Sequence, residues 1–152
     1  MPRNLIFFSY SHQDIKWLNE LKKMLSPWVH ANQLSISLWD DTKITPGTLW
    51  RQEIDTALNS ASVAVLLVSD NFLASEFIRE NELPPLLEAS RKEGLSLLWV
   101  YVSACLYKYT EIADYQSAQT KIFPLDLLNK PRRKLVLAEI CEQIIESYEK
   151  SL

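Results

Sequence analysis

Two glutamates stand close to a pair of prolines in the stretch FIRENELPPLL, residues 77–87. Proline is tolerated in the first turn of a helix, so Pro84 and Pro85 predict that a helix begins at about Leu83. Glu82 would then lie at the helix N-terminus, where the partial positive charge favours an ionised carboxylate. Such a carboxylate can stabilise positive charge that develops during a reaction. The alternative interpretation is an ordinary acid at a helix start.

Polar residues also follow the first two apolar segments of the chain, at Ser9, Tyr10 and Ser11 and again at Asp40 and Asp41. In open α/β sheets, ligands bind at the carboxyl ends of the strands, so these residues could border a ligand crevice. Ser-Tyr-Ser is equally an ordinary polar exit from a strand. The paired aspartates have no other ligands at metal spacing, and we expect them to cap a loop or line a pocket and not to bind a metal.

The composition limits the function further. The chain has 152 residues, 47% of them hydrophobic and 23% charged, as in a soluble globular protein of one domain. A net charge of -3 argues against nucleic-acid binding, and two glycines leave no room for a glycine-rich phosphate loop. The two cysteines are far apart and predict neither a disulfide nor a metal site. No signal peptide and no membrane-spanning run is present, so we expect a cytoplasmic protein.

Short apolar segments alternate with longer amphipathic ones, which predicts repeated βα units in a parallel sheet with helices on both faces. The segment 63–68 is apolar on both faces, as a central strand requires. The basic run 130–134 is interpreted as the solvated start of a helix. Strands are predicted at 5–8, 33–40, 63–68, 95–102 and, briefly, near 122–123; helices are predicted at 17–28, 49–59, from 83 onward, and at 137–148.

Three segments carry a family resemblance. FFSYSHQD, LWDDTKITPGTLWRQEIDTAL and VAVLLVSDNFLASEFIRENEL, in this order, resemble a TIR domain of bacterial type over nearly the whole chain. The resemblance implies an α/β, flavodoxin-like three-layer fold with a five-stranded parallel sheet and helices on both faces. We expect one TIR domain over residues 1–152, which a longer protein could join to a sensor domain.

The family implies one of two functions: cleavage of NAD+ at the nicotinamide glycosidic bond, or self-association as a non-catalytic interaction module. The catalytic glutamate of TIR enzymes lies after the third strand, and the matching position resembles Glu82. Many members have a tryptophan four residues before this glutamate. Here the corresponding residue is Phe77, and it stands five residues before Glu82, one more than in the family pattern. Glu80 and Glu76 therefore stay open as alternatives.

The resemblance also implies roles for other residues. Substrate contacts are expected from the strand ends and from two aromatic side chains that could stack on NAD+, at Ser9, Tyr10, Ser11, Trp39, Asp40 and Phe77. Aromatic side chains at such positions, Trp39 and Phe77 here, are more often core residues. The turn that contains Ile44, Pro46 and Gly47 matches a loop through which the family contacts a neighbouring protomer.

The expected function is thus an NAD+ glycohydrolase of bacterial anti-phage defence, activated by self-assembly and able in principle to form cyclic ADP-ribose. NAD+ is the substrate, and neither a cofactor nor a metal is expected. The expected partners are further copies of the chain, in a homo-oligomer or filament, and a sensor domain in a longer protein. Nucleic acid and membrane are not expected as partners.

Overall fold

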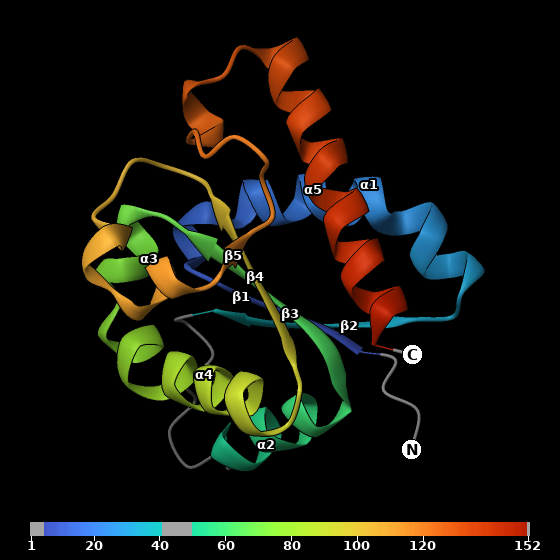
Figure 1. The fold of residues 1–152 in the computed structure, drawn as a ribbon, viewed down its shortest axis with the longest axis vertical. Coiled ribbons are helices and arrows are strands. Elements are labelled where there is room, and N and C mark those ends of the chain that lie inside the picture. The colour runs from blue at the N-terminus through green and yellow to red at the C-terminus, as the bar shows by residue number, and fades with distance from the viewer. Residues whose placement is uncertain (1–4, 41–49, 152) are drawn as a thin grey trace.

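Five parallel strands form a single sheet in the order β2-β1-β3-β4-β5 (Figure 1). A computed structural model describes residues 5–40 and 50–151, without the side chains of 37–40 and 50–51. The five-stranded parallel sheet confirms the prediction from the sequence. The strands are β1 (Leu5–Tyr10), β2 (Ser35–Asp40), β3 (Ala61–Val68), β4 (Ser96–Tyr101) and β5 (Gln116–Ser117).

Helices cover both faces of this sheet, as predicted (Figure 1). α1 (Ile15–Ala31) and α5 (Lys130–Lys150) share one hydrophobic cluster with one face, and α2 (Trp50–Ser60), α3 (Asp70–Ala74) and α4 (Leu83–Lys92) contribute to a second cluster on the other face. Successive side chains of a strand point to opposite faces, so β1 and β3 supply residues to both clusters. All eight residues of β3 are buried, as its apolar sequence predicts for a central strand.

The fifth strand was predicted in the wrong place. β5 consists of Gln116 and Ser117, which pair with β4, whereas Ile122 and Phe123 are 45% and 59% exposed. β5 is a short, polar edge strand, so it has no apolar pattern that sequence analysis could detect. Its pairing depends on the neighbouring β4 backbone.

Two smaller predictions from the sequence are confirmed. The basic run lies at the start of α5, where the Asn129 side chain accepts a hydrogen bond from the Arg132 amide. Both cysteines are free thiols. Burial raises the pKa of Cys141 to about 12, so this thiol stays neutral as part of the core between α1 and α5. Along the described ranges, no helix combines the length and the apolar character needed to cross a membrane.

Candidate active site

The chain makes one wide helical turn between α3 and α4. This turn is a π-helix over Ile78–Glu82, and it runs directly into α4. The Leu83 amide donates a hydrogen bond to the Ile78 carbonyl, five residues earlier. A π turn holds one residue more than an α-helical turn and often occurs at functional sites.

The two prolines explain why the helix widens at this point. Pro84 and Pro85 have no amide hydrogen to donate to the carbonyls of Glu80 and Asn81, and their rings crowd those carbonyls. The regular α-helical bonding pattern therefore cannot pass through this segment. The predicted helix start at Leu83 is confirmed. Glu82 is the N-cap residue of α4, as predicted. It is also the last residue of the π turn, and this turn engages the Leu83 amide of α4 in a hydrogen bond.

Glu82 contacts the end of the first strand from this turn. Its side chain is fully buried, and its Oε1 accepts a hydrogen bond from the Ser9 hydroxyl at 3.0 Å. Ser9 is itself fully buried near the carboxyl end of β1, 73 positions away in the sequence. The side chains of Glu76 and Glu80 are exposed. Of the three acids considered, the structure thus brings only Glu82 against the strand end.

The predicted group Ser9, Tyr10 and Ser11 is divided by the geometry of the strand. Ser9 lies on the face that meets Glu82, whereas Tyr10 is 2% exposed and packs in the core with α1 and α5. The Ser11 hydroxyl accepts a hydrogen bond from the Gln13 amide at 3.3 Å and caps a short 3₁₀ helix, His12–Asp14. Of these three residues, Ser9 is the one that donates its hydroxyl hydrogen to Glu82.

The remaining predicted residues have different positions. Trp39 and Asp40 are the backbone partners of Ser9 and Tyr10 in the β1–β2 pairing, which places them at the same edge of the sheet. Phe77 is buried directly before the π turn. The predicted assembly residues Ile44, Pro46 and Gly47 lie outside the described residues.

A second polar cluster joins the carboxyl ends of β1 and β3. Asp14 is 5% exposed and accepts hydrogen bonds from the Ser69 hydroxyl at 2.5 Å and from the Asn71 side-chain amide at 3.3 Å. The Ser69 oxygen also accepts from the Phe72 amide at 3.0 Å and so caps α3. Sequence analysis overlooked Asp14. Its signal was weak, because an acid four residues after a strand end has no distinctive spacing.

Loss of the Asp14 carboxylate should destabilise the fold. We expect Asp14→Ala to lower the free energy of unfolding by about 2 kcal/mol, because a buried hydroxyl loses its acceptor. Ser69→Ala should cost a similar amount, since the cap of α3 is lost as well. Urea unfolding of both variants and of the double variant measures this. Strictly additive losses would show that the two side chains do not act as a pair.

The comparisons with known proteins establish the family. A family model for the TIR domain matches residues 6–136. The chain belongs to the TIR domain family. A curated relative, the uncharacterised protein y4lF of Sinorhizobium fredii (strain NBRC 101917 / NGR234), is 31% identical to this TIR domain over 100 residues. That match covers 66% of this chain and 30% of y4lF, so the chain spans less than a third of the relative's length.

Solved structures support the flavodoxin-like three-layer fold of this TIR domain. The crystal structure of a diflavin flavoprotein A3 from Nostoc sp. matches with a TM-score of 0.64 at 8% identity, over 99% of this chain and 97% of that one. The crystal structure of the RPS4 and RRS1 TIR domain heterodimer matches with a TM-score of 0.61 at 11% identity, over 95% and 98% of the two chains. At such low identities these matches concern the fold alone.

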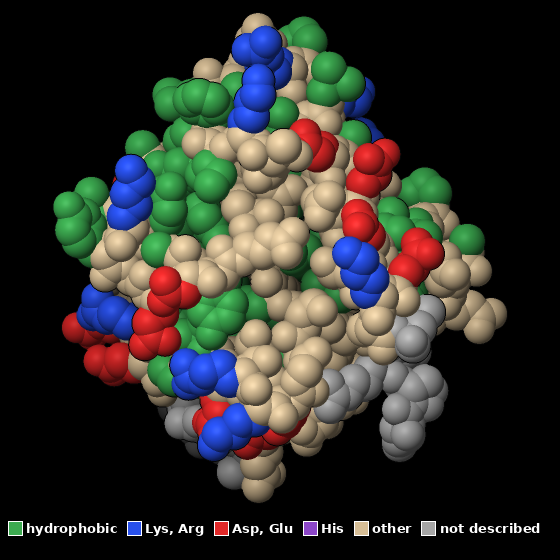
Figure 2. Space-filling view, in the orientation of Figure 1, with side chains coloured by type: hydrophobic (Ala, Val, Ile, Leu, Met, Phe, Trp, Pro, Cys, Tyr) green, Lys and Arg blue, Asp and Glu red, His purple; other side chains and the backbone are tan. Residues whose placement is uncertain are grey.

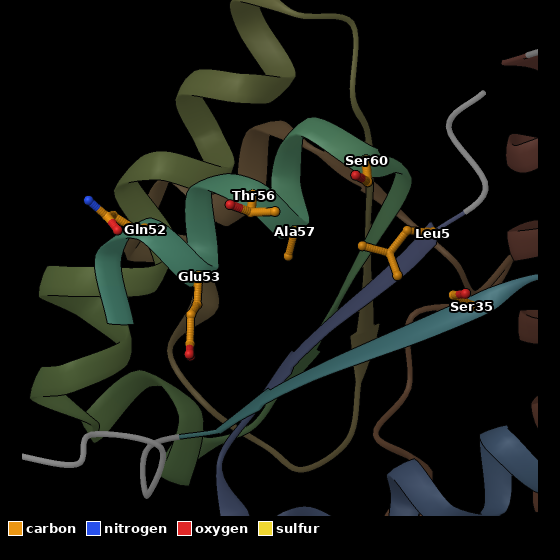
Figure 3. Close-up of a pocket in the computed structure, with 7 residues that line it drawn as sticks. All are labelled: Leu5, Ser35, Gln52, Glu53, Thr56, Ala57 and Ser60. Carbon is orange, nitrogen blue, oxygen red and sulfur yellow. The ribbon is translucent and has the colours of Figure 1, made fainter. Parts of the chain in front are cut away.

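The TIR domain has a large hollow at the opposite end of its sheet. Figure 3 shows this hollow, of about 660 Å³, between α2 and the first residues of β1 and β2, Leu5 and Ser35. Ser9 and Glu82 lie near the carboxyl end of β1 and do not line it. Across residues 5–40 and 50–151, no group of three histidine, cysteine, aspartate or glutamate side chains could hold a metal.

Proposed function

We propose that this TIR domain cleaves NAD+ at the bond between nicotinamide and ribose, with Glu82 as the catalytic carboxylate. The observation that carries this proposal is the contact of Glu82 with the carboxyl end of β1, where the Ser9 hydroxyl donates a hydrogen bond to it at 3.0 Å. Ligands of open α/β sheets bind at this edge. The membership of the TIR family supports the same assignment.

The chemistry of NAD+ requires little from the protein. Nicotinamide bound to ribose is already cationic, so it leaves without being protonated, and positive charge develops on the ribose. A carboxylate beside the ribose stabilises that charge and can accept hydrogen bonds from its hydroxyls. Water then adds to the anomeric carbon and loses a proton, which yields ADP-ribose; attack by an adenine nitrogen of the same molecule would yield the cyclic product.

The surroundings of Glu82 suit this role. A carboxylate shielded from bulk water interacts more strongly with a nearby positive charge than an exposed one. In the proposal, the Ser9 hydroxyl holds one carboxylate oxygen and orients the other toward the ribose. The π turn sets the direction from which Glu82 approaches the strand end.

We also propose that alignment of protomers activates the enzyme, in bacterial defence against phage and under the control of a sensor domain in a longer protein. TIR domains do assemble with one another, as the RPS4 and RRS1 heterodimer illustrates. Contacts between two different surfaces propagate as filaments unless the rotation closes a ring. NAD+ as the substrate agrees with a cytoplasmic location.

Nicotinamide release at rising protein concentration tests the proposal. Purified protein should release nicotinamide from NAD+, and the rate per molecule should rise with concentration or with a crowding agent, because protomers then meet more often. Chromatography of the products would measure this rate. A specific activity that stays constant over a wide concentration range would contradict activation by assembly.

A non-catalytic interaction module is the second candidate. The full burial of Glu82 favours it, since substrate must reach the carboxylate for catalysis. Such a module would release no nicotinamide at any concentration but would still associate with itself or with another TIR domain. Sedimentation of the same samples distinguishes the two candidates.

A further inference from the structure

A second hollow lies beside the π turn and does not include Glu82. It measures about 420 Å³ and is enclosed by α3, the π turn, α4 and the short 3₁₀ helix Glu111–Asp114. Small-molecule sites are commonly of this size and mostly apolar, with a few polar groups that orient the ligand. Its apolar side chains come from Phe72, Leu73, Ile78, Leu83 and Leu87.

One of the two arginines at this hollow, Arg79, differs from the other charged side chains there in its ion pairing. Glu88 pairs with Lys92 at 3.0 Å, and Arg91 pairs with Glu111 at 3.8 Å. Arg79 also lines the hollow, and its side chain is exposed. Among the described residues, Arg79 forms no ion pair. The lining thus carries two positive and two negative charges, and charges of both signs gather over α4 (Figure 2). Because Lys92, outside the lining, pairs with Glu88, Arg79 is the cation of the rim that a ligand can pair with.

We propose that this hollow binds a small anionic amphiphile, a molecule with an apolar body and one carboxylate, sulfonate or phosphate group. The apolar walls would take the body of the ligand out of water. The planar guanidinium of Arg79 would bind the anionic group with two parallel hydrogen bonds. A neutral apolar molecule would leave Arg79 unused, and a cation would meet its charge at the rim.

Occupancy of the hollow acts on the turn that carries Glu82. The hydrogen bond from the Leu83 amide to the Ile78 carbonyl closes the π turn, and the side chains of both residues line the hollow. A ligand that contacts Ile78 and Leu83 therefore favours one arrangement of the turn over others. This regulatory consequence rests on the proposed function of Glu82, whereas the binding of the ligand does not. By linkage, NAD+ would change the affinity for the amphiphile by the same factor.

The binding is tested with 1-anilinonaphthalene-8-sulfonate, which has an apolar aromatic body and one sulfonate. Fluorescence titration of the folded protein should show one saturable site. Arg79→Gln should weaken this binding about tenfold or more, since a charge-assisted contact is lost. The matched control is Arg132→Gln, the same change at an exposed arginine of α5, which should bind like the parent protein.

A second probe separates charge from apolar contact. N-phenyl-1-naphthylamine has the same ring systems without the sulfonate, and it should bind more weakly and respond little to Arg79→Gln. Leu73→Trp should fill part of the hollow and weaken both probes. Equal sulfonate binding by the parent and by Arg79→Gln would overturn the proposal, as would an equal loss in Arg132→Gln. A hollow closed by a second copy of the chain would instead show an Arg79-dependent dimer in sedimentation.

The regulatory consequence has its own measurement. A saturating concentration of the sulfonate probe should change the rate of nicotinamide release at least twofold in the parent protein. The same addition should have no effect on the rate of the Arg79→Gln variant. A bound probe without effect on that rate would overturn the coupling to Glu82. A protein that binds the probe but releases no nicotinamide under any condition contradicts the proposed function alone, because fluorescence reports the binding independently.

Discussion

Glu82→Gln should lower the rate of nicotinamide release by about a hundredfold to a thousandfold or more, the usual cost of removing one electrostatic contact to a transition state. Glutamine keeps the size of the side chain, and its amide oxygen can still accept the hydrogen bond from Ser9. The fold and any self-association should therefore survive. Product chromatography measures the activity, and circular dichroism with urea unfolding measures the fold.

The distribution of this loss between kinetic constants identifies its cause. A charge needed only in the transition state lowers kcat and leaves KM nearly unchanged. Glu80→Gln is the matched control, since Glu80 lies in the same turn with an exposed side chain. It should retain nearly full activity. An active Glu82→Gln enzyme would refute the assignment, and a loss in Glu80→Gln alone would move the catalytic role to that residue.

Ser9→Asp should abolish activity and strongly destabilise the protein. It places a second carboxylate next to Glu82 among buried side chains, at the position from which Ser9 now donates at 3.0 Å. Two buried carboxylates cannot both stay ionised at this separation without a large cost. We expect a loss of about 3–5 kcal/mol in the free energy of unfolding, as for an uncompensated buried charge.

Combined variants and pH test this explanation. Adding Glu82→Gln to Ser9→Asp removes one of the two charges and should restore part of the lost stability. The destabilisation of Ser9→Asp should also shrink as the pH falls, because one shared proton relieves the repulsion. Ser9→Ala is the control without a charge and should cost only about 1 kcal/mol. A Ser9→Asp protein as stable as Ser9→Ala at neutral pH would show that the two side chains are not close together in solution.

A dependence on Ser9 would also bear on the second candidate function. An interaction module has no need for an ionised, oriented carboxylate behind the strand end. In that case Glu82→Gln and Ser9→Ala should change stability slightly and leave self-association unaffected. The two functions therefore predict different results for the same pair of variants.

Local patterns in the sequence were sufficient to predict most of the strands and helices. The segment that forms β3 is apolar on both faces, and such a segment is stable only between two layers of helices. The helix start at Leu83 follows from Pro84 and Pro85, since proline has a fixed φ angle and no amide hydrogen and is therefore tolerated in the first turn of a helix. The position of β5 could not be predicted in this way. Gln116 and Ser117 form a strand only because β4 offers them hydrogen-bond partners.

The candidate site, too, was predicted from the sequence only in part. Sequence analysis named Glu82 and Ser9 separately, each from its own surroundings and from the family resemblance. Their contact spans 73 positions and depends on how the π turn packs against β1. The widened turn was not predicted, because Pro84 and Pro85 were interpreted only as the start of a helix and not as the cause of a wider turn before it.

The different positions of Ser9 and Tyr10 show most directly why the contacts at the site could not be predicted from the sequence. The two residues are adjacent in the sequence, yet strand geometry sends their side chains to opposite faces of the sheet. The sequence by itself determined the fold class, the central strand and the acids available for chemistry, because these depend on composition and local periodicity. Only the tertiary structure decided which acid meets which strand end, because that depends on packing between segments far apart in the chain.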